Sequence, residues 1–416
     1  MLRRKKLLRR IFGVVALVAL LGSIILAGFA STANAEPPAL SLGVKSAILL
    51  DYATGQTLFE KDADLPIPPA SLTKLMTLHL AYKKIAEGAI KKEDKVRISE
   101  RAWAATMPGS SVMFLEPGQN VTVGEIMKGI AIPSGNDAAV AIAEHISGSV
   151  DAFVALMNKE AQDMGFKTMR FTDPAGLNAT NVVTAREFAE FARRYIQLHP
   201  EALAELHSVV EFTYPMPQNL AKEKQGEKPV TQYNRNTLLG NLEGVDGLKT
   251  GFIDESGYNI AVTAKRGETR WVAVILGAPG RTEAEGSRNR AEAATAVLQW
   301  GFANFTTAKP EVPEIKPVRV WKGAANQIGL ETDRPVLLTV AKGQETKLIP
   351  TVHQEPSVTA PVKKGDKLGE LIYSADGKEV AKFSLLAADD VKQGNFFKRL
   401  WDTIRLTVSG WFSRGK

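Results

Sequence analysis

Strand-like segments that lie far apart in the chain constrain its fold more than any other feature. Residues 45–62 have the pattern of a strand pair with Gly55 in the turn, and residues 258–278 have that of two adjacent strands. Helical periodicity follows the last strand at 290–305, and between the two strand pairs it covers 71–85, 121–131, 137–147, 150–164 and 184–198. Sheets and helices must each cover an apolar face, so the pattern predicts an α+β domain, an antiparallel sheet covered by helices.

The chain changes character near residue 306. Residues 306–317 are spaced by prolines and are expected to form a linker. Short strand-like runs separated by Gly, Asp and Lys follow, at 318–321, 336–340, 346–349, 371–374 and 380–385. We therefore expect a first domain over 36–305 and a small all-β, sandwich-like domain over 318–394.

The N-terminal residues read as an export signal. Six basic residues fall in the first ten positions, an apolar run covers 11–30, and Ala33-Asn34-Ala35 follows. That order is typical of a secretory signal peptide over 1–35, cleaved after the Ala-x-Ala site. The apolar run is also long enough to span a bilayer, so a retained anchor is the alternative. Both interpretations place the rest of the chain outside the cytoplasm.

Residues 395–416 are predicted to form an amphipathic helix. At 100° per residue one arc collects the apolar side chains Phe397, Leu400, Trp401, Ile404, Val408, Trp411 and Phe412, and the segment has a net charge of +4. A helix packed on a core has the same periodicity. Two tryptophans, the positive charge and the terminal position favour a helix that lies in the headgroup region of a membrane.

The charge of the chain argues against nucleic acid as a partner. The formal net charge is +7, but the two ends carry the excess and residues 36–394 sum to −3. The chain has no cysteine, which excludes thiolate catalysis and thiolate metal sites. Its five histidines show no metal-ligand spacing, so we expect no metal and no other cofactor.

Three short motifs carry groups that could perform chemistry. Ser71 and Lys74 share a helix face, where a neutral lysine could act as the base that activates the serine. Ser134-Gly135-Asn136 precedes a helix and could present a hydroxyl and a carboxamide to a cleft. Lys249-Thr250-Gly251 lies on a strand edge, which could bind a carboxylate and pair with an extended peptide. Taken singly, each motif is also compatible with an ordinary cap, turn or strand.

In this order and spacing the motifs resemble the S-x-x-K, S-x-N and K-T-G set of serine β-lactamases and penicillin-binding proteins. The resemblance extends along the whole mature chain and is closest to the low-molecular-mass (class C) penicillin-binding proteins that act as D-alanyl-D-alanine carboxypeptidases. Further segments that carry it are 69–76, 109–115, 133–137, 236–240, 244–251 and 298–302, together with the β domain and the amphipathic terminus.

The resemblance implies a role for each motif residue. Ser71 would be the acylated nucleophile and Lys74 its base, while Ser134 would pass a proton to the leaving D-alanine. The substrate would be held by Asn136, Lys249, Thr250, Gly251 and Arg290, with the backbone N–H groups of Ser71 and Phe252 as the oxyanion hole. Some relatives have His at the position of Phe252, so a side-chain role is missing there.

The expected partners are the peptidoglycan stem pentapeptide, β-lactams as covalent inhibitors, and a membrane surface bound through 395–416, on the extracytoplasmic (periplasmic) side. Class A β-lactamases need a glutamate about 30 residues after S-x-N, and Phe171–Asn178 supplies none. Two alternatives stay open, a DD-endopeptidase that cuts cross-links and a wall-binding module with a decayed site.

Overall fold

The computed structural model describes the backbone of residues 37–413 and the side chains of residues 37–407. The predicted signal peptide therefore lies outside the described residues. Residues 42–413 form one unit by their backbone contacts.

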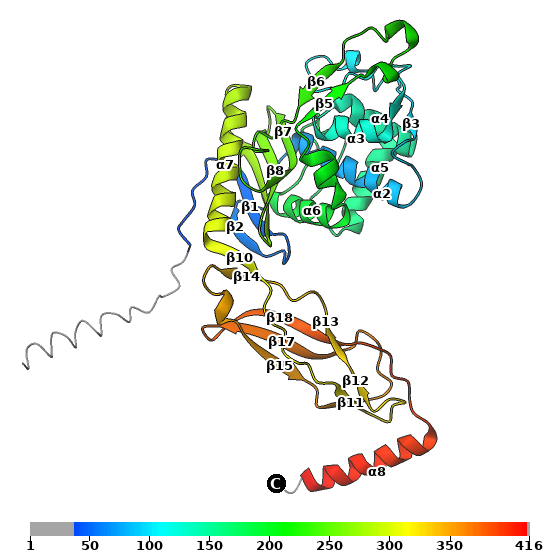
Figure 1. Ribbon diagram of the computed structural model, residues 1–416, viewed down its shortest axis with the longest axis vertical. Coiled ribbons are helices and arrows are strands. Elements are labelled where there is room, and N and C mark those ends of the chain that lie inside the picture. Colours follow the sequence, from blue (N-terminus) through cyan, green and yellow to red (C-terminus); the bar gives the residue numbers. More distant parts are fainter. Residues whose placement is uncertain (1–36, 414–416) are drawn as a thin grey trace, which may run out of the picture. The chain divides into compact units, whose positions relative to one another are not determined.

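The first domain is built on a five-stranded antiparallel sheet in the order β2-β1-β9-β8-β7 (Figure 1). Its strands are β1 (Ser46–Asp51), β2 (Thr57–Lys61), β7 (Val245–Ile253), β8 (Gly257–Arg266) and β9 (Thr269–Ala278). β1 pairs with β9, where Leu49 lies opposite Ala273, so the early and late strands do meet in one sheet. β7 has a strand partner on one side only, which leaves one of its edges free.

Helices cover this sheet as expected. The short helix η1 (Ala70–Thr73) leads into α2 (Lys74–Ala86), and the others are α3 (Val123–Ala131), α4 (Asn136–Ser147), α5 (Val150–Asp163), α6 (Ala185–Leu198) and α7 (Glu283–Asn304). α6 and α7 both contact β9, and Figure 1 shows them on opposite faces of the sheet. The apolar face of α6 buries Phe188, Phe191 and Tyr195. Periodicity placed the start of α7 at 290; the helix begins at Glu283 because the Thr282 side chain caps it there.

Small elements complete the first domain. The strands are β3 (Lys95–Val96), which pairs with β4 (Val121–Thr122), and β5 (Glu211–Tyr214), which pairs with β6 (Val230–Tyr233). The short helices are η2 (Ala104–Thr106), the π-helical turn η3 (Leu203–His207), η4 (Pro217–Asn219) and η5 (Lys222–Lys224).

The second domain is all β, as the sequence predicts. Its four-stranded sheet contains β13 (Leu330–Thr332), β18 (Lys378–Ala387), β17 (Lys367–Ala375) and β15 (Ile349–Gln354); a three-stranded sheet contains β12 (Gln327–Ile328), β11 (Val318–Trp321) and β16 (Ser357–Thr359). Leu371, Tyr373 and Phe383 fill part of its core. The run 346–349 is mostly not a strand, because the 3₁₀ turn η6 (Glu345–Lys347) occupies its start and β15 begins only at Ile349. Within the proline-spaced segment, β10 (Phe305–Ala308) pairs with β14 (Leu338–Ala341).

The chain ends in helix α8 (Phe396–Ser413). Five of its apolar side chains are exposed, namely Phe396, Phe397, Leu400, Trp401 and Ile404, whereas Leu406 is half-buried. Asp402 is buried instead, accepts a hydrogen bond from the Lys322 backbone N–H (2.7 Å) and pairs with Lys398 (3.3 Å). The side chains of Val408, Trp411 and Phe412 lie outside the described part. Between residues 37 and 413, no single helix is both long and apolar enough to cross a membrane.

Candidate active site

The three sequence motifs meet in one cleft. Its volume is about 540 Å³, and its walls include Ser71 from η1, Ser134 and Asn136 from the start of α4, Thr250, Gly251 and Phe252 from β7, and Arg290 from α7. Lys74 and Lys249 are buried beside it. The structure therefore brings together all nine residues to which the sequence assigned a role.

Lys74 is buried beside this cleft and has three polar contacts. Its Nζ lies 2.9 Å from the Ser71 Oγ, 2.6 Å from the Asn136 Oδ1 and 2.8 Å from the carbonyl oxygen of Ala175. Burial lowers the pKa of Lys74 to about 7, although the negative charges of Asp173 and Asp137 act in the opposite direction. Near neutral pH a large fraction of Lys74 is therefore uncharged and able to accept a proton.

Ser134 stands in a strained turn between α3 and α4. Its φ angle is +67°, in the left-handed region that residues other than glycine rarely adopt. The turn is fixed by its neighbours: the Gly135 N–H donates to the Gly129 carbonyl (2.8 Å), and the Asn136 N–H donates to the Ser111 carbonyl (2.8 Å). Held in this turn, the Ser134 hydroxyl faces Lys249 of β7.

Lys249 reaches Ser134 from β7. Its Nζ donates to the Ser134 Oγ at 2.9 Å, which forms a second serine–lysine pair across the cleft from the first. The pKa of Lys249 is lowered well below its ordinary value, first by burial and then by the charges of Lys74, Arg290 and Arg235. A site this rich in cations favours an anionic group of the substrate.

Gly251 permits the close approach of β7 to η1. A Cβ on Gly251 would lie 2.8 Å from the Pro69 carbonyl oxygen and 2.9 Å from the Ser71 nitrogen. Because β7 is an edge strand, its free side faces the cleft beside Ser71, where an extended peptide could pair with it.

Arg290 and Phe252 line the outer part of the cleft. Arg290 donates to the carbonyls of Gly251 (3.4 Å) and Arg235 (3.3 Å), and its guanidinium lies over the Tyr258 ring. Burial lowers the pKa of Arg290 to about 10. The Phe252 ring is 44% exposed and stacks on Tyr258 at 4.2 Å.

Three participants escaped the sequence reasoning. Ala175 contacts Lys74 through its backbone carbonyl, and such a contact does not require any particular residue type at that position. Asp137 accepts from the Met113 and Leu115 backbone N–H groups and so ties the 109–115 loop to the start of α4; its place directly after Ser-Gly-Asn was the available signal. Arg235 lies in the same cleft.

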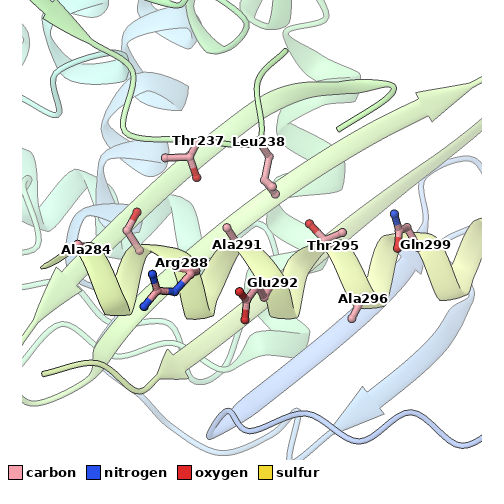
Figure 2. Close-up of a pocket in the computed structure, with 10 residues that line it drawn as sticks. Thr237, Leu238, Ala284, Arg288, Ala291, Glu292, Thr295, Ala296 and Gln299 are labelled. Atoms are coloured by element: carbon pink, nitrogen blue, oxygen red, sulfur yellow. The ribbon is translucent and has the colours of Figure 1, made fainter. Parts of the chain in front are cut away.

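A larger hollow, of about 730 Å³, runs along the outer face of α7 (Figure 2). Figure 2 shows Ala291, Thr295 and Ala296 on its helical wall, with Thr237 and Leu238 opposite. It contains none of the nine predicted site residues, so the chemistry belongs to the smaller cleft.

A serine hydroxyl beside a buried lysine that is partly neutral, with a second serine–lysine pair opposite, is the arrangement expected of a serine hydrolase. The comparisons with known proteins agree. Residues 31–280 match the family model of the D-alanyl-D-alanine carboxypeptidases, and residues 306–393 match that of the penicillin-binding protein 5 C-terminal domain. The chain therefore belongs to the D-alanyl-D-alanine carboxypeptidase family of low-molecular-mass penicillin-binding proteins.

The individual relatives cover between 64% and 92% of this chain. The D-alanyl-D-alanine carboxypeptidase DacC of Escherichia coli is 36% identical over 92% of this chain and 92% of its own. The crystal structure of penicillin-binding protein 5 from Haemophilus influenzae is 33% identical, covers 86% of this chain and 99% of its own, and has a TM-score of 0.76. The ampicillin-bound penicillin-binding protein D2 of Listeria monocytogenes is 26% identical, covers 64% of this chain and 99% of its own, and has a TM-score of 0.53.

Proposed function

We propose that this cleft removes the terminal D-alanine from peptidoglycan pentapeptides through an acyl-enzyme on Ser71. The observation that carries the proposal is the environment of Lys74. A neutral lysine amine has two N–H bonds and one lone pair, and Lys74 has three polar neighbours. When Asn136 and Ala175 accept the two N–H bonds, the lone pair faces the Ser71 hydroxyl.

The first half of the reaction moves protons along two paths, one at Lys74 and one through Ser134. The Ser71 Oγ bonds to the carbonyl carbon of the penultimate D-alanine while its proton passes to Lys74. The bond to the terminal D-alanine nitrogen then breaks as that nitrogen takes the Ser134 proton, and Ser134 regains one from the ammonium of Lys249 at 2.9 Å. The backbone N–H groups of Ser71 and Phe252 are the proposed donors to the oxyanion.

The second half uses the same two proton paths in reverse. Water attacks the ester carbon and loses a proton through Ser134 to the now neutral Lys249. The ester bond breaks as the Ser71 oxygen regains its proton from the Lys74 ammonium, and both lysines return to their starting states. Lys249, Thr250 and Arg290 are proposed to hold the terminal carboxylate in the first half, and Asn136 the substrate amide.

β-Lactams are proposed to acylate Ser71 and to remain bound. Fast release by a class A β-lactamase depends on a glutamate that drives water onto the ester. The Phe171–Asn178 segment contains one carboxylate, Asp173, and it accepts hydrogen bonds from the N–H groups of its own turn, so it is not free to activate water. Because the segment has no such glutamate, we expect a long-lived penicilloyl-enzyme.

Mass spectrometry of D-alanine release from a pentapeptide, with and without penicillin, tests the proposal. The wild type is expected to release one D-alanine per peptide and to stop on penicillin, while Ser71→Ala neither releases D-alanine nor labels with fluorescent penicillin. Ser374→Ala, in the β domain, is the matched control and retains both activities. D-alanine release by Ser71→Ala would overturn the mechanism. Cleavage of cross-linked dimers in preference to pentapeptides would support the endopeptidase instead.

The second part of the proposed function is attachment of α8 to the extracytoplasmic face of the cytoplasmic membrane. Phe397 is 79% exposed and Trp401 61% exposed, and the basic residues Lys398, Arg399 and Arg405 flank them. Burying such rings at the headgroup boundary is favourable, and cations beside them are attracted to anionic lipids. The Asp402 contact with the Lys322 backbone turns the opposite face of α8 toward the β domain.

Co-sedimentation of the mature chain with vesicles that contain an anionic lipid tests this attachment. The wild type is expected in the pellet, and Trp401→Glu in the supernatant. Thr359→Glu adds the same charge on the surface of the β domain and is expected to sediment like the wild type. If Trp401→Glu also sediments, α8 is not the anchor.

A further inference from the structure

Two backbone carbonyls of the turn Asp173–Asn178 accept hydrogen bonds from side chains of helix α2. The carbonyl of Ala175 accepts from Lys74 Nζ at 2.8 Å, and that of Pro174 accepts from the Thr77 hydroxyl at 2.7 Å. Lys74 and Thr77 are three residues apart and so lie on one helix face. The position of this turn therefore decides where one of the two amine acceptors of Lys74 stands.

The shape of the turn is set by the side chain of Asp173. Its Oδ1 accepts from the N–H groups of Ala175 (2.8 Å), Gly176 (2.5 Å) and Leu177 (3.3 Å), and its Oδ2 accepts from Asn178 N–H (3.1 Å). Four consecutive N–H groups thus converge on one carboxylate.

The backbone of Asp173 is held from the other side. The Asn181 side chain donates to the Asp173 carbonyl (3.2 Å) and to the Thr73 hydroxyl (3.0 Å), which links the turn to the residue before Lys74. Gly176 has a φ angle of +78°, and a Cβ there would lie 1.8 Å from the Ala70 carbonyl oxygen. The turn is therefore in direct contact with η1, which carries Ser71, and has little room to shift.

We propose that Asp173 is a positioning residue of the reaction: its carboxylate folds the 173–178 turn so that the Ala175 carbonyl holds the Lys74 amine with its lone pair toward Ser71. Asp173 does not touch the reacting atoms. With the turn displaced, an N–H of Lys74 would lose its acceptor and the amine could rotate, so fewer molecules would have the geometry needed for proton transfer. The inference rests on the proposed role of Lys74 as the base.

Asp173 also acts on Lys74 through its charge. The charged groups that influence Lys74 are Asp173 and Asp137, which favour its protonated form, and Lys249, which lies across the cleft. Burial lowers the pKa of Lys74, and the negative charge of Asp173 raises it. Loss of that charge therefore lowers the pKa of Lys74 further. The acid limb of kcat/KM, which reports this base, then moves to lower pH.

Asp173→Asn and Asp173→Glu separate charge from geometry. Asn keeps an acceptor for part of the turn and removes the charge, whereas Glu keeps the charge and displaces the carboxylate by one methylene. Both variants are expected to lower kcat at least about tenfold with a smaller change in KM. Only Asp173→Asn is expected to move the acid limb of kcat/KM. Asp163→Asn, on the exposed end of α5, is the matched control and retains wild-type kinetics.

The measurements are the pH profile of D-alanine release, the rate of fluorescent penicillin labelling, and circular dichroism to check folding. If Asp173→Asn does not fold, the Asp173→Glu variant provides the test. A reduced kcat, with the acid limb of kcat/KM at its wild-type pH, supports the inference. A wild-type kcat overturns it. Wild-type kcat in a folded Asp173→Asn overturns it as well, as does an acid limb that stays in place. A wild type with no acid limb near pH 7 would refute the proposed role of Lys74 itself, a separate failure.

Discussion

Replacement of Lys74 by Met is predicted to abolish catalysis and, at pH 6, to make the protein more stable. In the folded state burial lowers the pKa of Lys74 from an ordinary 10.5 to about 7. At pH 6 Lys74 is protonated in both states, and its buried charge makes the folded state less favourable relative to the unfolded chain. The difference between the two pKa values corresponds to about 5 kcal/mol. Met has a similar volume and no charge, so it removes this cost.

The gain is smaller than 5 kcal/mol because Met also leaves two buried acceptors, the Asn136 Oδ1 and the Ala175 carbonyl, without a donor. Each lost hydrogen bond costs about 1–2 kcal/mol. We therefore expect Lys74→Met to raise the free energy of unfolding by about 2 kcal/mol at pH 6.

The pH dependence gives the sharper test. Between pH 7 and 10.5 the unfolded chain keeps the Lys74 proton and the folded chain has lost it, so wild-type stability rises with pH in this window. The advantage of Lys74→Met is then largest below pH 7, falls by about 1.4 kcal/mol per pH unit above it, disappears at about pH 8.5 and is reversed at pH 9.

Urea unfolding of both proteins at pH 6, 7.5 and 9, followed by tryptophan fluorescence, measures the difference. Lys159→Met removes an exposed lysine and is the control, whose difference from wild type should not depend on pH in this way. Two results would refute the reasoning. One is a Lys74→Met protein less stable than wild type at pH 6, and the other is a difference in the free energy of unfolding that is the same at all three pH values.

Three further substitutions test other contacts. Gly251→Ala places a methyl group under 3 Å from two backbone atoms of the Pro69–Ser71 segment and is expected to lower kcat/KM and the penicillin acylation rate about 100-fold. Asp137→Ala leaves three backbone N–H groups without their carboxylate partner and should destabilise the protein by about 3 kcal/mol in thermal unfolding. Glu160→Gln weakens hydrogen bonds from His79 and Lys83, which lower the pKa of Glu160 to about 2; we expect a loss of about 2 kcal/mol at pH 7 that disappears as the pH falls toward 2.

The sequence predicted the layout of the fold because that layout follows from patterns of side chains. Strand-like runs around turns in 45–62 and 258–278 predicted early and late strands of one antiparallel sheet, and β1 does pair with β9. The residues at which helices and strands begin and end were harder to predict. The start of α7 was missed by seven residues because Thr282 caps a first turn of small and charged residues that has no apolar stripe.

The candidate site was predictable to the extent that it depends on side chains. Ser71, Ser134 and Lys249 belong to motifs with fixed spacing, and the fold brings them into one cleft. The Ala175 carbonyl could not be predicted, because every residue has one and only the path of the backbone decides which carbonyl reaches Lys74. The sequence shows only that Asp173 carries a carboxylate; the structure shows that this carboxylate binds the N–H groups of its own turn.

The electrostatics of the cleft connect substrate recognition to proton delivery. In the free enzyme, burial and the charges of Lys74, Arg290 and Arg235 lower the pKa of Lys249, which weakens its hold on a proton. A substrate carboxylate bound beside Lys249 acts in the opposite direction and favours its ammonium form. That ammonium is the proposed proton source, through Ser134, for the departing D-alanine. A pentapeptide whose terminal carboxylate is replaced by an amide should therefore lose kcat as well as affinity, because it removes the charge that prepares Lys249 to donate.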